Sequence, residues 1–94
     1  MLKKIKILGC EFRVTRDVDT RKYLGYCCVN KQHIKVAKGI HPKQAQAALI
    51  HEVLEALNSM LRLGMPHRTI VALETGLNAV VQDNPKLLDL WRKK

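Results

Sequence analysis

The chain has 94 residues, enough for one small domain with a single core. Its apolar fraction of 47% and charged fraction of 27% are typical of a folded protein and argue against disorder. No apolar run approaches the roughly 18–20 residues that cross a bilayer, and the N-terminus lacks the apolar stretch of a secretion signal. The three cysteines form no framework of spaced pairs, so we expect reduced thiols and a cytoplasmic protein.

The charge balance is strongly basic, with 17 Lys and Arg against 8 Asp and Glu, for a net charge of +9. Six cations and no carboxylate lie between Thr20 and His51. Such a field attracts nucleic acid, acidic protein surfaces or anionic lipid, although it can also serve solubility alone. Aromatic residues make up only 4% of the chain, which supplies a base-stacking platform poorly. Nucleic acid is therefore a candidate partner, but not the favoured one.

The first part of the chain has the pattern of β-structure. Apolar and polar residues alternate over 5–8 and 12–14, and two further strands are predicted over 23–29 and 33–37. The polar stretch 16–22 predicts a loop. We therefore predict a short antiparallel sheet of three to four strands within residues 1–38.

The second part, 42–92, has the pattern of helices. Pro42 suits the first turn of a long, unusually apolar helix over 43–63, which we expect to be central and buried. A second helix with an apolar face is predicted over 67–82, and Pro85 opens a short last helix. The prediction is one α+β domain, 1–94, with the sheet packed on the central helix.

One segment of the central helix nearly matches a catalytic motif. His51-Glu52-Val53-Leu54-Glu55 follows the H-E-x-x-H pattern of zinc peptidases, with Glu55 in place of the second histidine. A carboxylate can also bind zinc. His51 and Glu55 lie one turn apart on the same face, and Glu52 is rotated by about 100°. This spacing places two ligands on the metal and leaves Glu52 to take a proton from the metal-bound water.

A catalytic zinc site has three protein ligands, and the second helix offers two candidates for the third. His67 lies at its start and Glu74 two turns later. The alternative is an ordinary hydrogen-bonded pair of His51 and Glu55, with Arg62 or Arg68 neutralising the carboxylates. The motif leaves both interpretations open.

The wider sequence resembles a known family. The order of elements, the stretch 49–54 and the ending Asp83-Asn84-Pro85 resemble the minimal ImmA/IrrE-type zinc metallopeptidases of phages and mobile elements. The resemblance covers roughly residues 3–90. It departs from the family at two positions, since Glu55 replaces the second histidine and His67 stands where the family has a downstream Glu ligand.

This exchange keeps a set of two imidazoles and one carboxylate. The resemblance therefore implies Zn²⁺ held by His51, Glu55 and His67, with Glu52 as general base in peptide-bond hydrolysis. Glu74 would then orient a ligand or be the third ligand itself. The implied substrate is an intracellular protein, with a repressor as one candidate.

Two further features could serve such a reaction. Tyr26 could stabilise the oxyanion, although a tyrosine in a sheet more often fills the core. The strand 33–38 could hold an extended substrate by main-chain pairing, and Lys35 and Lys38 would then favour acidic substrates. Cys27, Cys28 and His33 lack the C-x-x-C spacing of a second zinc site.

Two rival functions remain. The chain could be a catalytically inactive family member that acts as a basic binding module for nucleic acid or an acidic protein. It could also be a structural accessory protein of a phage or mobile element, active only in a complex.

Overall fold

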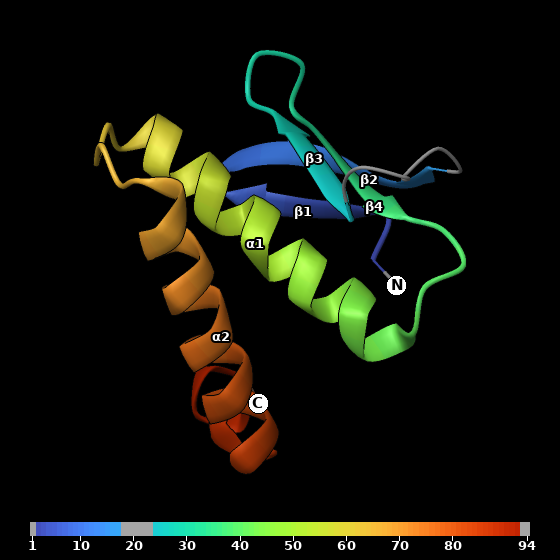
Figure 1. Ribbon diagram of the computed structural model, residues 1–94, viewed down its shortest axis with the longest axis vertical. Coiled ribbons are helices and arrows are strands. Elements are labelled where there is room, and N and C mark those ends of the chain that lie inside the picture. The colour runs from blue at the N-terminus through green and yellow to red at the C-terminus, as the bar shows by residue number, and fades with distance from the viewer. Residues whose placement is uncertain (1, 18–23, 93–94) are drawn as a thin grey trace.

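The computed structural model describes residues 2–17 and 24–92. Figure 1 shows a twisted sheet with α1 laid across it and α2 leading away from the end of α1. The elements are β1 (Lys4–Ile7), β2 (Cys10–Asp17), β3 (Gly25–Cys28), β4 (His33–Ala37), α1 (Pro42–Met60), α2 (His67–Asp83) and the 3-10 helix η1 (Leu87–Trp91). This architecture confirms the predicted α+β fold. Tyr23 and most of the predicted loop lie outside the described residues.

The sheet is mixed rather than wholly antiparallel. Its strand order is β1-β2-β4-β3, in which β1 pairs antiparallel with β2, and β3 antiparallel with β4. The central pair, β2 and β4, runs parallel, so the prediction of an antiparallel sheet was wrong for this pair. Alternation in a sequence indicates which face of a strand is buried, but it does not identify the neighbouring strand. Here the β3–β4 hairpin places its second strand, β4, beside β2.

The first hairpin is closed by two residues in the left-handed region. Leu8 has φ 51° and Gly9 has φ 81°, between the paired residues Ile7 and Cys10. Two-residue turns with positive φ at both positions match the twist of the strands that they join. Gly9 therefore fixes the register that buries Ile7.

One hydrophobic core lies between the sheet and α1. The strands contribute large side chains and the helix contributes small ones, which allows the helix to approach the sheet closely. The core residues are Ile7, Phe12, Val14, Ile34, Val36, Ala45, Ala48 and Ala56. In α1 the buried positions Ala45, Ala48, Glu52 and Ala56 share one face, so the helix is buried on one side only. The prediction of a helix buried on most sides was wrong.

The start of α1 has a well-defined cap. Nδ1 of His41 accepts a hydrogen bond from the backbone N–H of Lys43 at 3.1 Å, and the Gln44 side chain accepts one from the His41 N–H at 3.2 Å. Pro42 takes the first position, as predicted. This cap sets the start of α1, and with it the rotation that aims His51 and Glu52.

The second helix packs on α1 with little burial. Of its residues only Ile70 is buried, whereas the rest of the predicted apolar face stays 40–46% exposed at Val71, Leu73, Leu77, Val80 and Val81. The predicted last helix is the single 3-10 turn η1. No helix in the described ranges is long and apolar enough to cross a membrane.

Candidate metal centre

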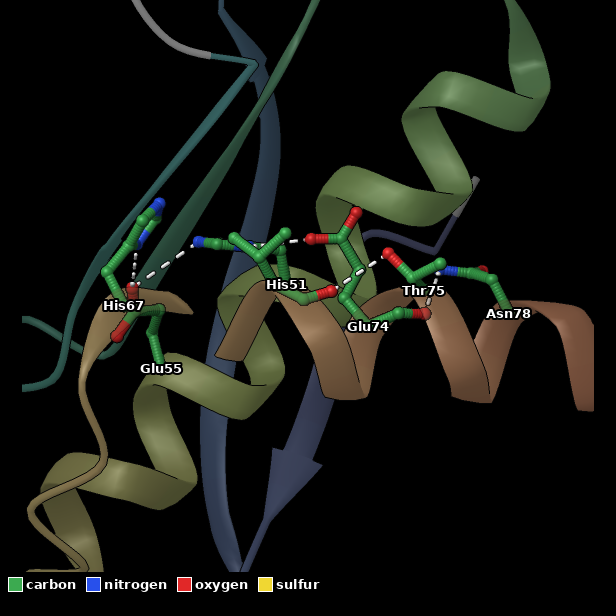
Figure 2. A network of polar contacts seen from close by, with 7 residues as sticks. His51, Glu55, His67, Glu74, Thr75 and Asn78 are labelled. Atoms are coloured by element: carbon green, nitrogen blue, oxygen red, sulfur yellow. Dashed lines mark hydrogen bonds and ion pairs between the residues drawn. The ribbon is translucent and has the colours of Figure 1, made fainter. Parts of the chain in front are cut away.

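Three predicted ligands meet where α2 begins beside α1. Oε2 of Glu55 lies 3.3 Å from Nε2 of His51 and 3.7 Å from Nδ1 of His67. The two imidazole rings approach edge to face, with centroids 5.2 Å apart. Figure 2 shows the contacts from both rings meeting at the Glu55 carboxylate. The structure thus brings together residues 16 positions apart, as the exchanged-ligand hypothesis requires.

The spacing of these atoms suits a single ion. One ligand atom from each of His51, Glu55 and His67 can be chosen so that all lie within 4.8 Å of one another, and the group could therefore hold a metal. Ligands at about 2.0–2.1 Å from a tetrahedral ion stand roughly 3.4 Å apart. The two distances from Glu55 are close to that value. In the part of the chain that the structure describes, the ionic partners of Glu55 are these histidines rather than Arg62 or Arg68.

The other nitrogen of His51 is held by the second helix. Nδ1 lies 2.8 Å from Oε1 of Glu74 (Figure 2). In the tautomer that carries its proton on Nδ1 and donates it to Glu74, a neutral imidazole presents the lone pair of Nε2 toward Glu55. Glu74 therefore stands in the position of an orienting residue, and it is not part of the three-residue group.

Glu52 is the one buried charged residue in the described chain, with 7% of its surface exposed. Its carboxyl group packs against Gly25 of β3, where an added Cβ would lie 2.8 Å from Oε2. Burial is the main reason that the pKa of Glu52 rises to about 7, assisted by the charges of Glu55 and Glu74 and opposed by His51. A carboxylate with a pKa near 7 can both accept and return a proton at neutral pH.

A groove runs between α1 and β3 past these residues. Its main part has a volume of about 610 Å³ and reaches from Gly25 along β3 to Asn30, with His51, Glu52, Glu55 and His67 opposite. A second hollow of about 300 Å³ continues on the other side, toward Leu24 and Gln44. Both parts share Gly25, His51, Glu52 and His67. The candidate centre therefore lies midway along an open path.

The strand beside this groove is β3 and not β4. Both edges of β4 are paired, to β2 and to β3, so the predicted role of strand 33–38 in holding a substrate was wrong. β3 ends the sheet, and its outer edge is free of strand partners within the described residues. Main-chain pairing with an extended chain requires such an edge.

Tyr26 contributes to the groove, but its side-chain partners lie elsewhere. A hydrogen bond with Cys28 raises the pKa of the Tyr26 hydroxyl, and the ammonium of Lys35 lies 5.8 Å from its ring centroid. Tyr26 pairs with Lys35 across the strands, so both side chains project on the sheet face away from α1. The role of oxyanion stabiliser stays a prediction that this placement does not favour.

Cys27, Cys28 and His33, the residues considered for a second zinc site, do not point to a common position. Nε2 of His33 lies 2.7 Å from the Thr15 hydroxyl. Cys27 and Cys28 are adjacent in β3 and point to opposite faces. Burial also raises the pKa of the Cys27 thiol to about 11, so the proton loss that metal binding requires would cost more there than at an exposed thiol.

Sequence reasoning missed Asn58. Its side chain accepts a hydrogen bond from the Met65 N–H at 2.9 Å and donates one to the Met65 carbonyl at 3.0 Å. This pair closes the link between the helices and sets the start of α2, where His67 lies. The only available signal was an Asn before the Gly64-Met65-Pro66 break, a residue type that often bonds to turn backbone.

Comparison with known proteins does not add a family assignment. No family model, no curated protein and no solved structure matches the chain. The resemblance to ImmA/IrrE-type peptidases rests on the motifs alone.

Proposed function

We propose that the protein is a zinc-dependent peptidase whose metal ligands are His51, Glu55 and His67. The observation that carries this proposal is the spacing of the three donors, with 3.3 Å and 3.7 Å from the shared Glu55 oxygen to the two histidine nitrogens. Two imidazoles and one carboxylate are a common ligand set of catalytic zinc, and they leave the fourth position open. Zn²⁺ held there would supply Lewis-acid polarisation of a carbonyl and lower the pKa of water.

Glu52 is the proposed general base. It lies one residue from His51 and lines the same groove, so its carboxylate faces the space between the ligands and β3. Its pKa of about 7 allows it to take a proton from the attacking water and to deliver it to the leaving amine. Gly25 leaves the room in which that carboxylate sits.

The proposed substrate is a protein segment in extended conformation. The groove is open along its length, and its far wall is the unpaired edge of β3. A segment bound there would pair its backbone with β3 and pass its peptide bonds across Glu52. Cleavage would therefore require an unstructured stretch in the substrate, as a linker or a terminus provides.

Metal analysis and a peptide-cleavage assay test the proposal together. Purified protein should bind one Zn²⁺ per chain, and His51→Ala and His67→Ala should each weaken binding more than 100-fold, since each removes a direct ligand. His33→Ala is the matched control, because His33 bonds to Thr15 outside the groove and should bind zinc normally.

Glu52→Gln separates binding from chemistry. This variant should keep its zinc and lose at least about 100-fold in the cleavage rate of an unstructured peptide library. Full cleavage by Glu52→Gln would contradict the base assignment, and an absence of zinc binding in wild type would contradict the metal site. A zinc-free chain that binds DNA with a steep salt dependence would support the basic module instead.

A further inference from the structure

Beyond its contact with α1, α2 carries an apolar stripe, next to the line of the buried Ile70, that nothing in the described chain covers. Leu73, Leu77, Val80 and Val81 are 41–46% exposed, and they follow Ile70 along the helix. A helix of 17 residues gains most of its stability in a protein from packing of its apolar face. With one buried side chain, α2 has most of that face unsatisfied.

The spacing along the stripe points to another helix as the covering element. The exposed apolar residues at 73, 77 and 80 recur at intervals of four and three, which is the pattern of a helix–helix seam. Gly76 lies on the border of the stripe, three residues from Leu73 and four from Val80 on the helix. An added Cβ there would meet nothing within 4 Å. A glycine inside a helix costs about 1 kcal/mol relative to alanine, and close approach of a second helix is a reason to have one.

The charge of this surface favours a second copy as the partner. Between Thr69 and Gln82 the helix has one ionisable residue, Glu74, and its carboxylate is bonded to His51. The stripe is thus uncharged, although the chain as a whole has a net charge of +9. An acidic partner would find no positive charge on this surface to pair with. A second copy presents the same neutral stripe with the same spacing.

The exposed apolar surface continues from the stripe onto η1. At the C-terminal end of α2, η1 adds Leu88, Leu90 and Trp91, which are 54–78% exposed. Figure 1 shows this segment folded back beside the end of α2. Complete covering of these three residues and the stripe would bury at most on the order of 800 Å² of each copy, which is the share that each partner gives to a standard interface.

We propose that two copies of this chain pair through α2, stripe against stripe, about a two-fold axis. In such an isologous contact Leu77, at the middle of the stripe, lies nearest the axis and meets its own copy. This proposal stands apart from the proposed peptidase, since Leu77 is ten residues, or roughly 15 Å of helix, from His67.

Sedimentation velocity on the full chain, over a concentration series, tests the pairing. Wild type should sediment as a dimer of twice the 10.7 kDa chain mass at tens of micromolar, and it should dissociate on dilution. Leu77→Glu should raise the dissociation constant roughly 100-fold, because it buries two like charges at the axis. Ala79→Glu adds the same charge on the opposite side of α2 and should leave the dimer intact.

Salt distinguishes this contact from charge-driven association. Since the two copies repel each other at +9, the dimer should become tighter between 50 and 500 mM NaCl as the repulsion is screened. The melting temperature of wild type should also rise with protein concentration, which keeps the test valid if Leu77→Glu does not fold.

A wild-type chain that stays monomeric at several hundred micromolar in high salt would overturn the pairing. A Leu77→Glu protein that is folded by circular dichroism and dimerises as tightly as wild type would overturn it too. Zinc binding and cleavage by that variant are separate readouts, so failure of one proposal is distinguishable from failure of the other.

Discussion

Nδ1 of His51 lies 2.8 Å from Oε1 of Glu74, a residue 23 positions later on the facing helix. This contact decides which nitrogen of His51 faces the candidate metal centre. It also joins α1 to α2 through a polar bond next to the packing of Ile70. The motif residue His51 therefore depends for its orientation on a residue outside the motif.

Replacement of Glu74 tests whether it orients His51 or binds the metal itself. Glu74→Ala should weaken zinc binding by about 10–100-fold, because His51 loses the acceptor that fixes its ring. Glu74→Gln keeps an oxygen that can accept the Nδ1–H bond, so it should stay within a few-fold of wild type. Competition titration with a chromophoric chelator measures both.

Thr75→Ala is the control, since Thr75 is exposed on α2 and bonds only to the Val71 carbonyl in the described contacts. If Glu74→Gln loses zinc as severely as Glu74→Ala, then Glu74 is a direct ligand and the orienting role is wrong.

An alanine at position 25 should displace the proposed base without touching the ligands. The added Cβ would lie 2.8 Å from Oε2 and 3.0 Å from Cγ of Glu52, closer than real contacts allow, so the Glu52 side chain must move. We expect Gly25→Ala to lower the cleavage rate at least tenfold with unchanged zinc affinity, since misplaced catalytic groups lose rate.

Cys28→Ala, in the same strand, is the matched control and should cleave normally. A Gly25→Ala enzyme with wild-type activity would show that Glu52 does not need its present position.

The metal-free protein should lose stability as pH rises through the titration of Glu52. The pKa of this carboxyl is raised from about 4.5 to about 7 on folding. Between these values the folded protein keeps a proton that the unfolded chain has lost, so the free energy of unfolding falls with rising pH. The loss is complete above pH 7 and amounts to about 3 kcal/mol.

Urea unfolding of wild type and Glu52→Gln in the presence of EDTA measures this effect, because glutamine removes the titration. The difference between the two stabilities should change across pH 4.5–7 and stay flat above it. Parallel curves over the whole range would mean that burial does not perturb Glu52.

Replacement of Asn58 should destabilise the segment between α1 and α2 that positions His67. Asn58→Ala removes both hydrogen bonds to Met65, which we expect to cost about 1–2 kcal/mol of stability. Zinc affinity should fall by about tenfold, since His67 must then be ordered by the metal. Ser59→Ala, at the next and exposed position, should change neither quantity. Normal zinc affinity in a destabilised Asn58→Ala would confine its role to the fold.

Much of this arrangement followed from local patterns in the sequence. Alternation located the strands, and β4 was predicted with its observed ends. Pro42 marked the start of α1, and helical spacing placed His51 and Glu55 on one face. Each of these features depends on residues close together in the chain, where residue type and spacing carry the information.

Features that depend on distant residues were predicted less well. The parallel pairing of β2 with β4 and the free edge of β3 depend on where the β3–β4 hairpin packs in the sheet. The sequence of a single strand does not determine this position. The contact of Gly25 with Glu52 joins a strand and a helix 27 residues apart. The approach of His67 to Glu55 was expected from the resemblance, but its geometry depends on the Asn58 link.

The small packing area of α2 has a consequence for the lifetime of the protein. This helix has one buried side chain, Ile70, and polar contacts at Glu74, His67 and Asn58 hold it against α1. A metal bound by residues of both helices would then stabilise their contact, and detachment of α2 from α1 would require loss of the metal. With zinc bound as in the proposed function, degradation of the chain by cellular proteases should be slower where the ion is available.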